Sequence, residues 1–176
     1  MEYVSSDTNV WIDFSIINAL ALPFTLDMTY IMFRETVNQE ILYPPGLKDK
    51  LLVLGLQPVQ ITADEFFYAD EITDKYPRLS VHDRIALSIA RHRDIMLLTG
   101  DGALRKAAIR ENVAVTGTIG LLDRIYLEKH IDAAEYRRCL EQLKRYNGGE
   151  IRLPEDELER RLRDLDDRLP ITGNKH

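Results

Sequence analysis

The sequence predicts an α/β fold in which a central parallel β-sheet is flanked by helices. Short apolar runs of strand length, at residues 95–98 and again at 113–115, are each followed by a polar turn and a segment with helical periodicity. Strands that alternate with helices form parallel sheets, and right-handed crossovers bring the carboxyl ends of the strands to one edge. A chain of 176 residues suits one well-buried domain, so a site at that edge must combine distant segments.

The first half of the chain predicts short strands separated by helices. Strands are expected at residues 3–6, 24–33 and 59–61, where β-branched and aromatic residues gather. A helix should open at Asp7, directly after the first strand, with apolar residues near helical spacing. A second helix is expected at 35–42, before Pro44-Pro45-Gly46 stops it.

Helices dominate the second half of the chain. Residues 80–92 show helical periodicity, and Ser80 with Asp83 fits a capping box at the start of that helix. Two amphipathic helices should follow, one from Asp132 and one from Pro154. We therefore expect three parts: an α/β body over 1–130, a C-terminal helical extension of the same domain over 131–169, and a flexible tail over 170–176.

Composition limits where the protein can work. Hydrophobic residues make up 45% and charged residues 30% of the chain, which is an ordinary mix for a folded protein. The single cysteine, Cys139, falls in an apolar helical row and cannot form an internal disulfide, and the first residues lack a signal-peptide pattern. Asp27 and Arg34 interrupt the longest apolar region. We expect a cytoplasmic protein with no membrane partner.

Charge is unevenly distributed along the chain, whose net charge is −6. Residues 1–77 hold 4 Lys/Arg against 12 Asp/Glu, a net −8, whereas residues 78–145 hold 13 against 9, a net +4. The separation can be ordinary solvated surface. It also suits metal binding beside phosphate binding.

Four acidic residues stand where a parallel sheet would place a site. Asp7 and Asp101 directly follow predicted strands, Asp83 begins a helix, and Glu40 lies on the helix after the second strand. Clustered carboxylates raise each other's pKa, and a divalent cation relieves that cost. Each acid also has a local explanation, because the three aspartates can be helix caps and Glu40 a solvated helix residue.

Four segments of the chain resemble PIN-domain nucleases, over residues 3 to about 126. The segments are Asp7-Thr8-Asn9-Val10-Trp11-Ile12, Val37-Asn38-Gln39-Glu40-Ile41-Leu42, residues 79–87 around Asp83, and residues 97–105 around Asp101. The 18-residue separation of Asp83 and Asp101 is also similar to the family. From Gly120-Leu121-Leu122 onward, the chain resembles a branch of VapC-type toxins from toxin–antitoxin pairs.

The resemblance implies a metal-dependent endoribonuclease that hydrolyses RNA phosphodiester bonds. Its catalytic and metal-binding residues would be Asp7, Glu40, Asp83 and Asp101, which would hold one or two Mg²⁺ or Mn²⁺ ions. Asn9 and Thr99 would orient water or substrate around the metal, or else make only turn and cap hydrogen bonds. None of the four histidines has metal-ligand spacing, so all are expected at the surface or in packing.

Substrate and protein partners follow from the same resemblance. We expect Arg84, Arg105 and Lys106 to contact RNA, since each closely follows a predicted metal ligand. The resemblance also implies a homodimer and a small inhibitory antitoxin. The first helix has more apolar side chains than one core-facing stripe needs, and these could serve either interface. They are Trp11, Phe14, Ile16 and Ile17.

Two other functions stay open at this point. The first is a catalytically inactive PIN-like module that binds RNA or protein, which a missing metal ligand in the fold would favour. The second is an acid-phosphatase-like hydrolase with an aspartyl nucleophile. Such enzymes have a motif of two aspartates on either side of one residue. In this chain, Asn9 stands in the place of the second aspartate.

Overall fold

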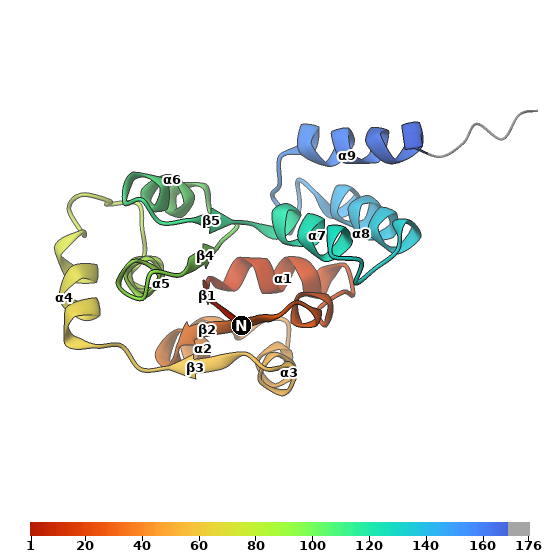
Figure 1. The fold of residues 1–176 in the computed structure, drawn as a ribbon. Helices are drawn as coiled ribbons and strands as arrows, with labels where there is room; N and C mark the ends of the chain where they lie inside the picture. Colours follow the sequence, from red (N-terminus) through yellow and green to blue (C-terminus); the bar gives the residue numbers. More distant parts are fainter. Residues whose placement is uncertain (169–176) are drawn as a thin grey trace, which may run out of the picture.

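The computed structural model describes residues 1–168 and confirms the α/β architecture with a parallel sheet (Figure 1). Five strands lie in the order β3-β2-β1-β4-β5, and every pairing is parallel. The strands are β1 (Glu2–Ser6), β2 (Met28–Phe33), β3 (Gln57–Val59), β4 (Met96–Leu98) and β5 (Val115–Thr116). Ser6 at the end of β1 is paired with Leu98 at the end of β4. The chain segments that begin at Asp7 and Thr99 therefore leave the sheet side by side.

Helices cover both faces of this sheet (Figure 1). Along the described chain they are α1 (Thr8–Ile16), the 3₁₀ helix η1 (Leu22–Thr25), α2 (Arg34–Glu40), α3 (Leu47–Leu54), α4 (Ala63–Glu71), α5 (Val81–His92), α6 (Gly102–Arg110), α7 (Thr118–Leu127), α8 (Ala133–Tyr146) and α9 (Glu155–Arg168). In this part of the chain, no helix is both long enough and apolar enough to cross a membrane.

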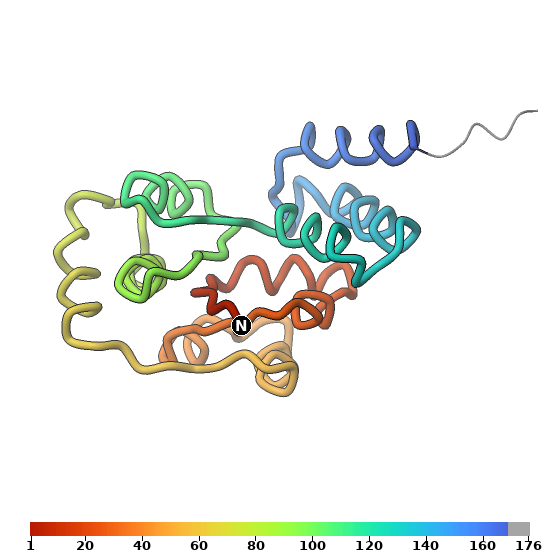
Figure 2. The backbone as a smooth tube through the Cα atoms, in the orientation of Figure 1, coloured from red at the N-terminus to blue at the C-terminus, as the bar shows by residue number. Residues whose placement is uncertain are grey.

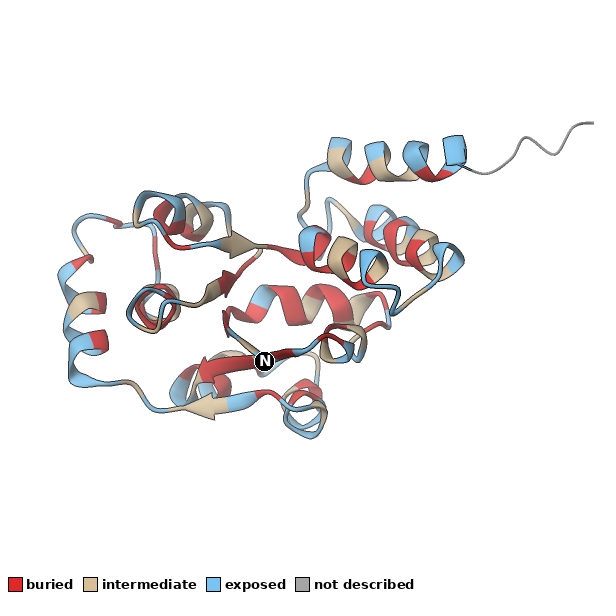
Figure 3. Ribbon diagram, in the orientation of Figure 1, coloured by how far each residue is buried: buried red, intermediate tan, exposed pale blue. Residues whose placement is uncertain are grey.

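Apolar side chains pack against both faces, as a fully covered parallel sheet requires. Tyr30 and Leu98 join a core with α1, α7 and α8, whereas their neighbours Ile31 and Leu97 join clusters with α4, α5 and α6. Successive strand residues point to opposite faces, which explains this division. Figure 3 shows buried residues concentrated in β2, β4 and α1.

The first helix lies between the sheet and α7, so its apolar side chains are used inside the molecule (Figure 1). Trp11 is fully buried, stacks on Phe24 and meets Tyr30 edge-on. Phe14 and Ile17 are also buried, and Ile16 is half-buried against the same core. The expectation that Trp11, Phe14, Ile16 and Ile17 offer surplus apolar surface to a partner is therefore wrong, because a helix covered on two sides needs a wider apolar face.

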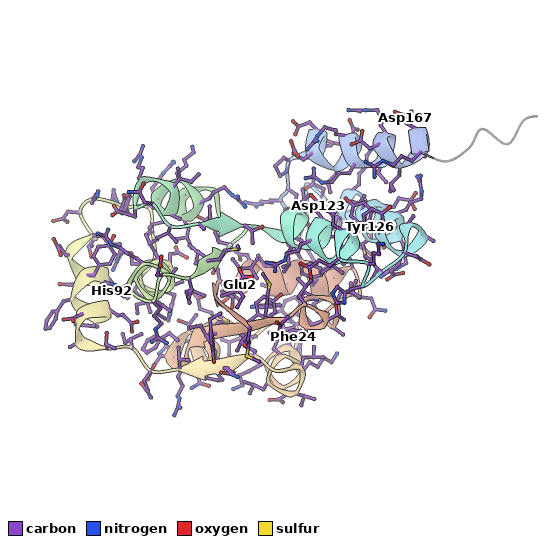
Figure 4. All side chains as sticks on the ribbon, in the orientation of Figure 1. Glu2, Phe24, His92, Asp123, Tyr126 and Asp167 are labelled. Carbon is purple, nitrogen blue, oxygen red and sulfur yellow. The ribbon has the colours of Figure 1, made fainter. Side chains whose placement is uncertain are left out.

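The C-terminal helices share the core of the sheet. Apolar residues of α8 and α9, with the buried Cys139 among them, belong to the same cluster as α1 and α7. Arg161 on α9 pairs with Asp123 on α7 at 2.6 Å, and Figure 4 labels Asp123 where α7 faces α9. The tail expected over 170–176, and position 169 of the predicted extension, lie outside the described residues.

Several element boundaries differ from the sequence prediction. The strand expected at 24–33 begins only at Met28, because Pro23 favours the 3₁₀ turn η1 before it. The strand expected at 59–61 lies two residues earlier, and the one expected at 113–115 is the short β5. Helices α3 and α4 were not predicted, because their exposed residues leave a weak apolar pattern in the sequence.

Candidate active site

Asp7 stands at the carboxyl end of the central strand and makes three short hydrogen bonds. Its backbone N–H donates to the Leu98 carbonyl at 2.8 Å, which extends the pairing of β1 with β4. Its Oδ1 accepts the Thr8 N–H at 2.7 Å, so Asp7 is the N-cap of α1, and its Oδ2 accepts the Thr99 hydroxyl at 2.9 Å. The residue is 6% exposed.

The electrostatic environment of Asp7 opposes its ionisation. Burial raises the pKa of Asp7 to about 7, and the charges of Asp83 and Glu40 act in the same direction. The hydrogen bonds from Thr99 and Thr8 lower this pKa but do not cancel the rise. No cationic side chain within residues 1–168 pairs with this carboxylate. Asp7 is therefore a buried acid whose ionised form would be stabilised by a bound cation.

The Thr99 hydroxyl links two of the predicted acids. Thr99 is fully buried at the end of β4, donates to Asp7 and accepts the backbone N–H of Asp101 at 3.0 Å. The more exposed Asn9 reaches the same Asp7 oxygen through its Nδ2 at 3.5 Å, near the limit of a hydrogen bond. Both residues predicted to support the site thus contact Asp7 itself.

Asp101 and Asp83 are helix caps, as the local interpretation predicted. Asp101 Oδ1 accepts the Leu104 N–H at 2.7 Å. Asp83 Oδ2 accepts the Ser80 N–H at 2.8 Å, and Ser80 Oγ accepts the Asp83 N–H at 3.1 Å, which completes the capping box. Capping uses one oxygen of each carboxylate. The other oxygen makes no hydrogen bond within the described chain, so capping leaves it able to bind a metal.

Glu40 is joined to Asp7 through Thr8, a residue that the sequence analysis did not single out. Glu40 ends α2, and its Oε2 accepts the Thr8 hydroxyl at 3.1 Å. Thr8 follows Asp7 directly, so one short segment holds both carboxylates in place. The position of Thr8 between Asp7 and Asn9 was the only signal available in the sequence.

His82 has a packing role near this site. Its Nδ1 lies 2.8 Å from the Thr36 hydroxyl, and this contact ties α5 to α2. These are the helices that carry Asp83 and Glu40. His82 therefore fixes the spacing of two predicted acids without being a metal ligand.

The four acids do not form a closed set of metal ligands. Among residues 1–168, no three His, Cys, Asp or Glu side chains are close enough together to hold one metal ion. The charges of Glu40 and Asp83 nevertheless act on Asp7, and Thr99 connects Asp7 to Asp101. The available donors are carboxylate oxygens, which are the ligands that Mg²⁺ and Mn²⁺ prefer. The chemistry of the site fits such a cation, in an open arrangement.

Two of the three predicted RNA contacts remain available to a ligand. The guanidinium of Arg84 donates to the carbonyls of Ala69 and Leu79, both at 2.9 Å. Arg84 therefore braces α5 against the segment before it, and we do not include it in the substrate surface. Arg105 makes one long contact of 3.3 Å to the Thr99 carbonyl, and Lys106 is exposed.

Another buried acid, Asp13, lies beneath the turn that carries Asp101. Asp13 on α1 accepts the Thr118 hydroxyl at 2.6 Å, and burial raises its pKa to about 6. A Cβ atom added to Gly100 would lie 4.0 Å from Asp13 Oδ2 and 3.7 Å from the Asn9 Cβ, so α1 packs closely beneath the turn. Asp13 falls in the apolar row of α1, and an acid in such a row was the signal that could have revealed it.

The fold and the site together define an α/β protein with acidic residues gathered at the carboxyl edge of a parallel sheet. A family model, DUF3368, described as a PIN domain, matches residues 3–167, and the chain belongs to the PIN-domain family. PIN domains are generally nucleases, in the hydrolase class, and they typically use divalent metal ions. Comparisons with curated proteins and with solved structures gave no match.

Proposed function

We propose that the chain is a Mg²⁺- or Mn²⁺-dependent endoribonuclease that hydrolyses phosphodiester bonds in RNA. The observation that carries this proposal is the buried Asp7, which feels the charges of Glu40 and Asp83 and has no cationic partner in the described chain. Without a bound cation, the ionised form of Asp7 is unfavourable in this environment, and a cation bound beside it would stabilise that form. Membership in the PIN-domain family agrees with this chemistry.

The four acidic residues of the site would bind the cation. Asp7, Glu40, Asp83 and Asp101 would hold the cation directly or through water. A divalent cation bound there supplies Lewis-acid polarisation of the scissile phosphate and makes the attacking water more acidic.

Neighbouring side chains hold this site in place and extend it toward the substrate. The Thr99 hydroxyl fixes the orientation of Asp7, and the Thr8 hydroxyl fixes Glu40. Arg105 and Lys106, on the helix that Asp101 caps, would attract the phosphates of the substrate.

Cleavage of single-stranded RNA by the purified chain tests the proposal. We expect cleavage with Mg²⁺ or Mn²⁺, none in EDTA, and recovery when the metal is restored. Asp7→Asn should lower the rate by about 100-fold or more, since removing even a supporting residue of a metal site costs about 10- to 100-fold.

Asp132→Asn is the matched control for that substitution. Asp132 caps α8 through the Glu135 N–H at 2.8 Å, as Asp101 caps α6, but it stands in the C-terminal extension. We expect the Asp132→Asn variant to cleave at the wild-type rate. Undiminished cleavage in excess EDTA, or by Asp7→Asn, would show that the four acids are not a metal site.

The toxin role is part of the same proposal. It rests on the resemblance of the chain from Gly120 onward to VapC-type toxins, which also implies a homodimer, a small antitoxin and a cytoplasmic setting. Expression in a bacterial host should arrest growth, and coexpression of the adjacent reading frame should relieve the arrest. Normal growth with an active nuclease would contradict the toxin role alone.

An inactive PIN-like binding module is the competing function. The open arrangement of the acids favours it, because no three of the metal-ligating side chains in residues 1–168 converge. The two functions differ in one measurement. An inactive module binds RNA equally well with and without Mg²⁺ and yields no cleavage products at any metal concentration.

A further inference from the structure

Two hollows meet at the N-terminus of α6. The first, of about 890 Å³, lies between the β5–α7 turn and the linker that joins α8 to α9, and we call it the glycine hollow. The second, of about 520 Å³, lies between α6 and residues 75–79, and we call it the basic hollow. Gly102 lines both hollows, and Gly100 lines the first. These glycines stand on either side of Asp101, so both hollows adjoin the candidate active site.

The basic hollow is lined by four cationic side chains, three of which have no partner in the described chain. Its lining contains Lys75, Arg78, Lys106 and Arg110, and no Asp or Glu. Lys75 pairs with Glu111 at 2.5 Å. The other three are exposed and make no ion pair or hydrogen bond within residues 1–168. In a chain of net charge −6, unneutralised cations in one place indicate an anionic ligand.

Helix α6 concentrates this charge. Its nine residues include Arg105, Lys106 and Arg110 and no acid. Lys106 and Arg110 are four residues apart, so they are neighbours on the helix surface and repel each other. A polyanion would relieve that repulsion. By contrast, arginines elsewhere, such as Arg93 and Arg161, are paired with buried or half-buried carboxylates.

The glycine hollow lets a ligand approach the backbone closely. It is lined by five of the nine glycines of the chain, at positions 100, 102, 117, 120 and 148. A Cβ atom at Gly117 would lie 2.5 Å from Arg105 Nη2 and 3.1 Å from the Thr99 carbonyl. Glycine at this position therefore lets Arg105 lie across the β5–α7 turn.

The α8–α9 linker adds a second cation to the glycine hollow. Arg152 is exposed and forms no ion pair in the described chain, whereas the nearby Arg161 is already paired with Asp123 and Glu157. Figure 2 traces the chain from β5 into α7 and, farther on, the linker that rises to α9. The C-terminal extension also brings Glu155 and Glu157 to this lining, and Glu157 is paired with Arg161. Arg152 is the cation that the extension leaves available to a ligand next to the candidate active site.

We propose that a single strand of RNA crosses the N-terminus of α6 and occupies both hollows. Phosphates on one side of the scissile bond would contact Arg78, Lys106 and Arg110, and those on the other side would contact Arg105 and Arg152. A mononucleotide fills only one hollow, whereas an extended polyanion reaches both and passes Asp101 between them. This inference rests on the proposed nuclease function and adds that the substrate must extend in both directions from the cut.

Binding measured without metal tests this path independently of cleavage. The probe is a fluorescent 12-nucleotide RNA in EDTA, titrated by anisotropy at several salt concentrations. Arg78→Ala/Arg110→Ala should weaken binding about 10-fold or more and reduce the salt slope by roughly 1.4, at about 0.7 for each phosphate contact on a single strand. Arg152→Ala should reduce the slope by about 0.7.

Matched controls separate this path from a general charge effect. Lys50→Ala/Lys129→Ala removes the same two charges from exposed sites outside both hollows and should leave the salt slope unchanged. The substituted side chains are exposed, and thermal melts should confirm intact folding.

The outcomes separate the path from the proposed function. Unchanged affinity and slope in Arg78→Ala/Arg110→Ala and Arg152→Ala, with Asp7→Asn inactive, would overturn the path and leave the nuclease standing. The reverse pattern, reduced slopes with cleavage persisting in EDTA, would overturn the metal mechanism and support the path. If poly-glutamate displaced the RNA as effectively as unlabelled RNA of equal charge, the hollows would be a site for an acidic protein segment, and the RNA path would be wrong.

Discussion

The ionisation of Asp7 should carry a measurable cost in the metal-free protein. Folding raises the pKa of Asp7 from 3.8 to about 7. At about 1.4 kcal/mol for each pH unit, this rise corresponds to roughly 4 kcal/mol of stability lost once Asp7 is fully ionised. The folded state holds the proton more tightly than the unfolded state. The penalty is therefore absent below about pH 4, grows as the pH rises to about 7, and is constant above that.

Asp7→Asn removes this penalty while it keeps the size of the side chain. The amide oxygen can still accept the Thr8 N–H, but the amide NH₂ cannot accept the Thr99 hydroxyl, which costs about 1 kcal/mol. Between pH 5 and pH 8, the free energy of unfolding of the variant should rise relative to wild type by about 2 to 3 kcal/mol. At pH 8 in EDTA, the variant should be the more stable protein.

Urea unfolding in EDTA at pH 5, 6, 7 and 8 measures this difference. The difference between variant and wild type cancels other titrating groups, such as Asp13. Asp132→Asn should cost about 1 kcal/mol at every pH, because it loses only a helix cap. Added Mg²⁺ should stabilise the wild type and not Asp7→Asn. A difference that stays constant from pH 5 to pH 8 would refute the reasoning.

Three further substitutions test the surroundings of the site. Thr99→Val should cost about 1 to 3 kcal/mol and lower cleavage about 10- to 100-fold, and Thr99→Ser should restore both, since the hydroxyl holds Asp7. Burial alone would raise the pKa of Glu111, but hydrogen bonds from Lys75 and Tyr76 lower it to about 2. Glu111→Gln should therefore destabilise the protein by about 1 kcal/mol at pH 7, and the difference should vanish as the pH falls from about 4.5 to 2. Asp83→Asn should abolish cleavage and stabilisation by Mg²⁺ with little change of stability in EDTA.

Local chemistry made the starts of helices predictable. Asp7, Ser80 and Asp101 each cap the helix that the sequence analysis placed after them. Each of these caps joins residues at most three positions apart, and such patterns are visible in a sequence. The parallel sheet was predictable for a similar reason, because apolar strands alternate with helices along the chain.

Long-range contacts were not predictable in the same way. The hydrogen bond from Thr99 to Asp7 joins residues 92 positions apart, and the bond from Thr8 to Glu40 joins residues 32 apart. Trp11 was misassigned because nothing local shows that α7 covers the far side of α1. The two hydrogen bonds of Arg84 were not predictable because their acceptors are backbone carbonyls, and carbonyl positions depend on the fold rather than on residue type.

Asp83 shows how one carboxylate can serve structure and chemistry together, and two substitutions separate these roles. Ser80→Ala breaks the capping box but keeps the charge of Asp83, so it should cost about 1 kcal/mol and leave cleavage intact. Asp83→Asn keeps an oxygen that can accept the Ser80 N–H but removes the charge. Near a helix N-terminus, the lost charge costs about 0.3 to 1 kcal/mol, and in EDTA the relief of repulsion on Asp7 offsets it. If Ser80→Ala loses cleavage and Asp83→Asn retains it, Asp83 acts only as a cap. If Ser80→Ala retains cleavage and Asp83→Asn loses it, the charge of Asp83 is part of the metal site. The cap is then broken in the variant that cleaves RNA and intact in the variant that does not.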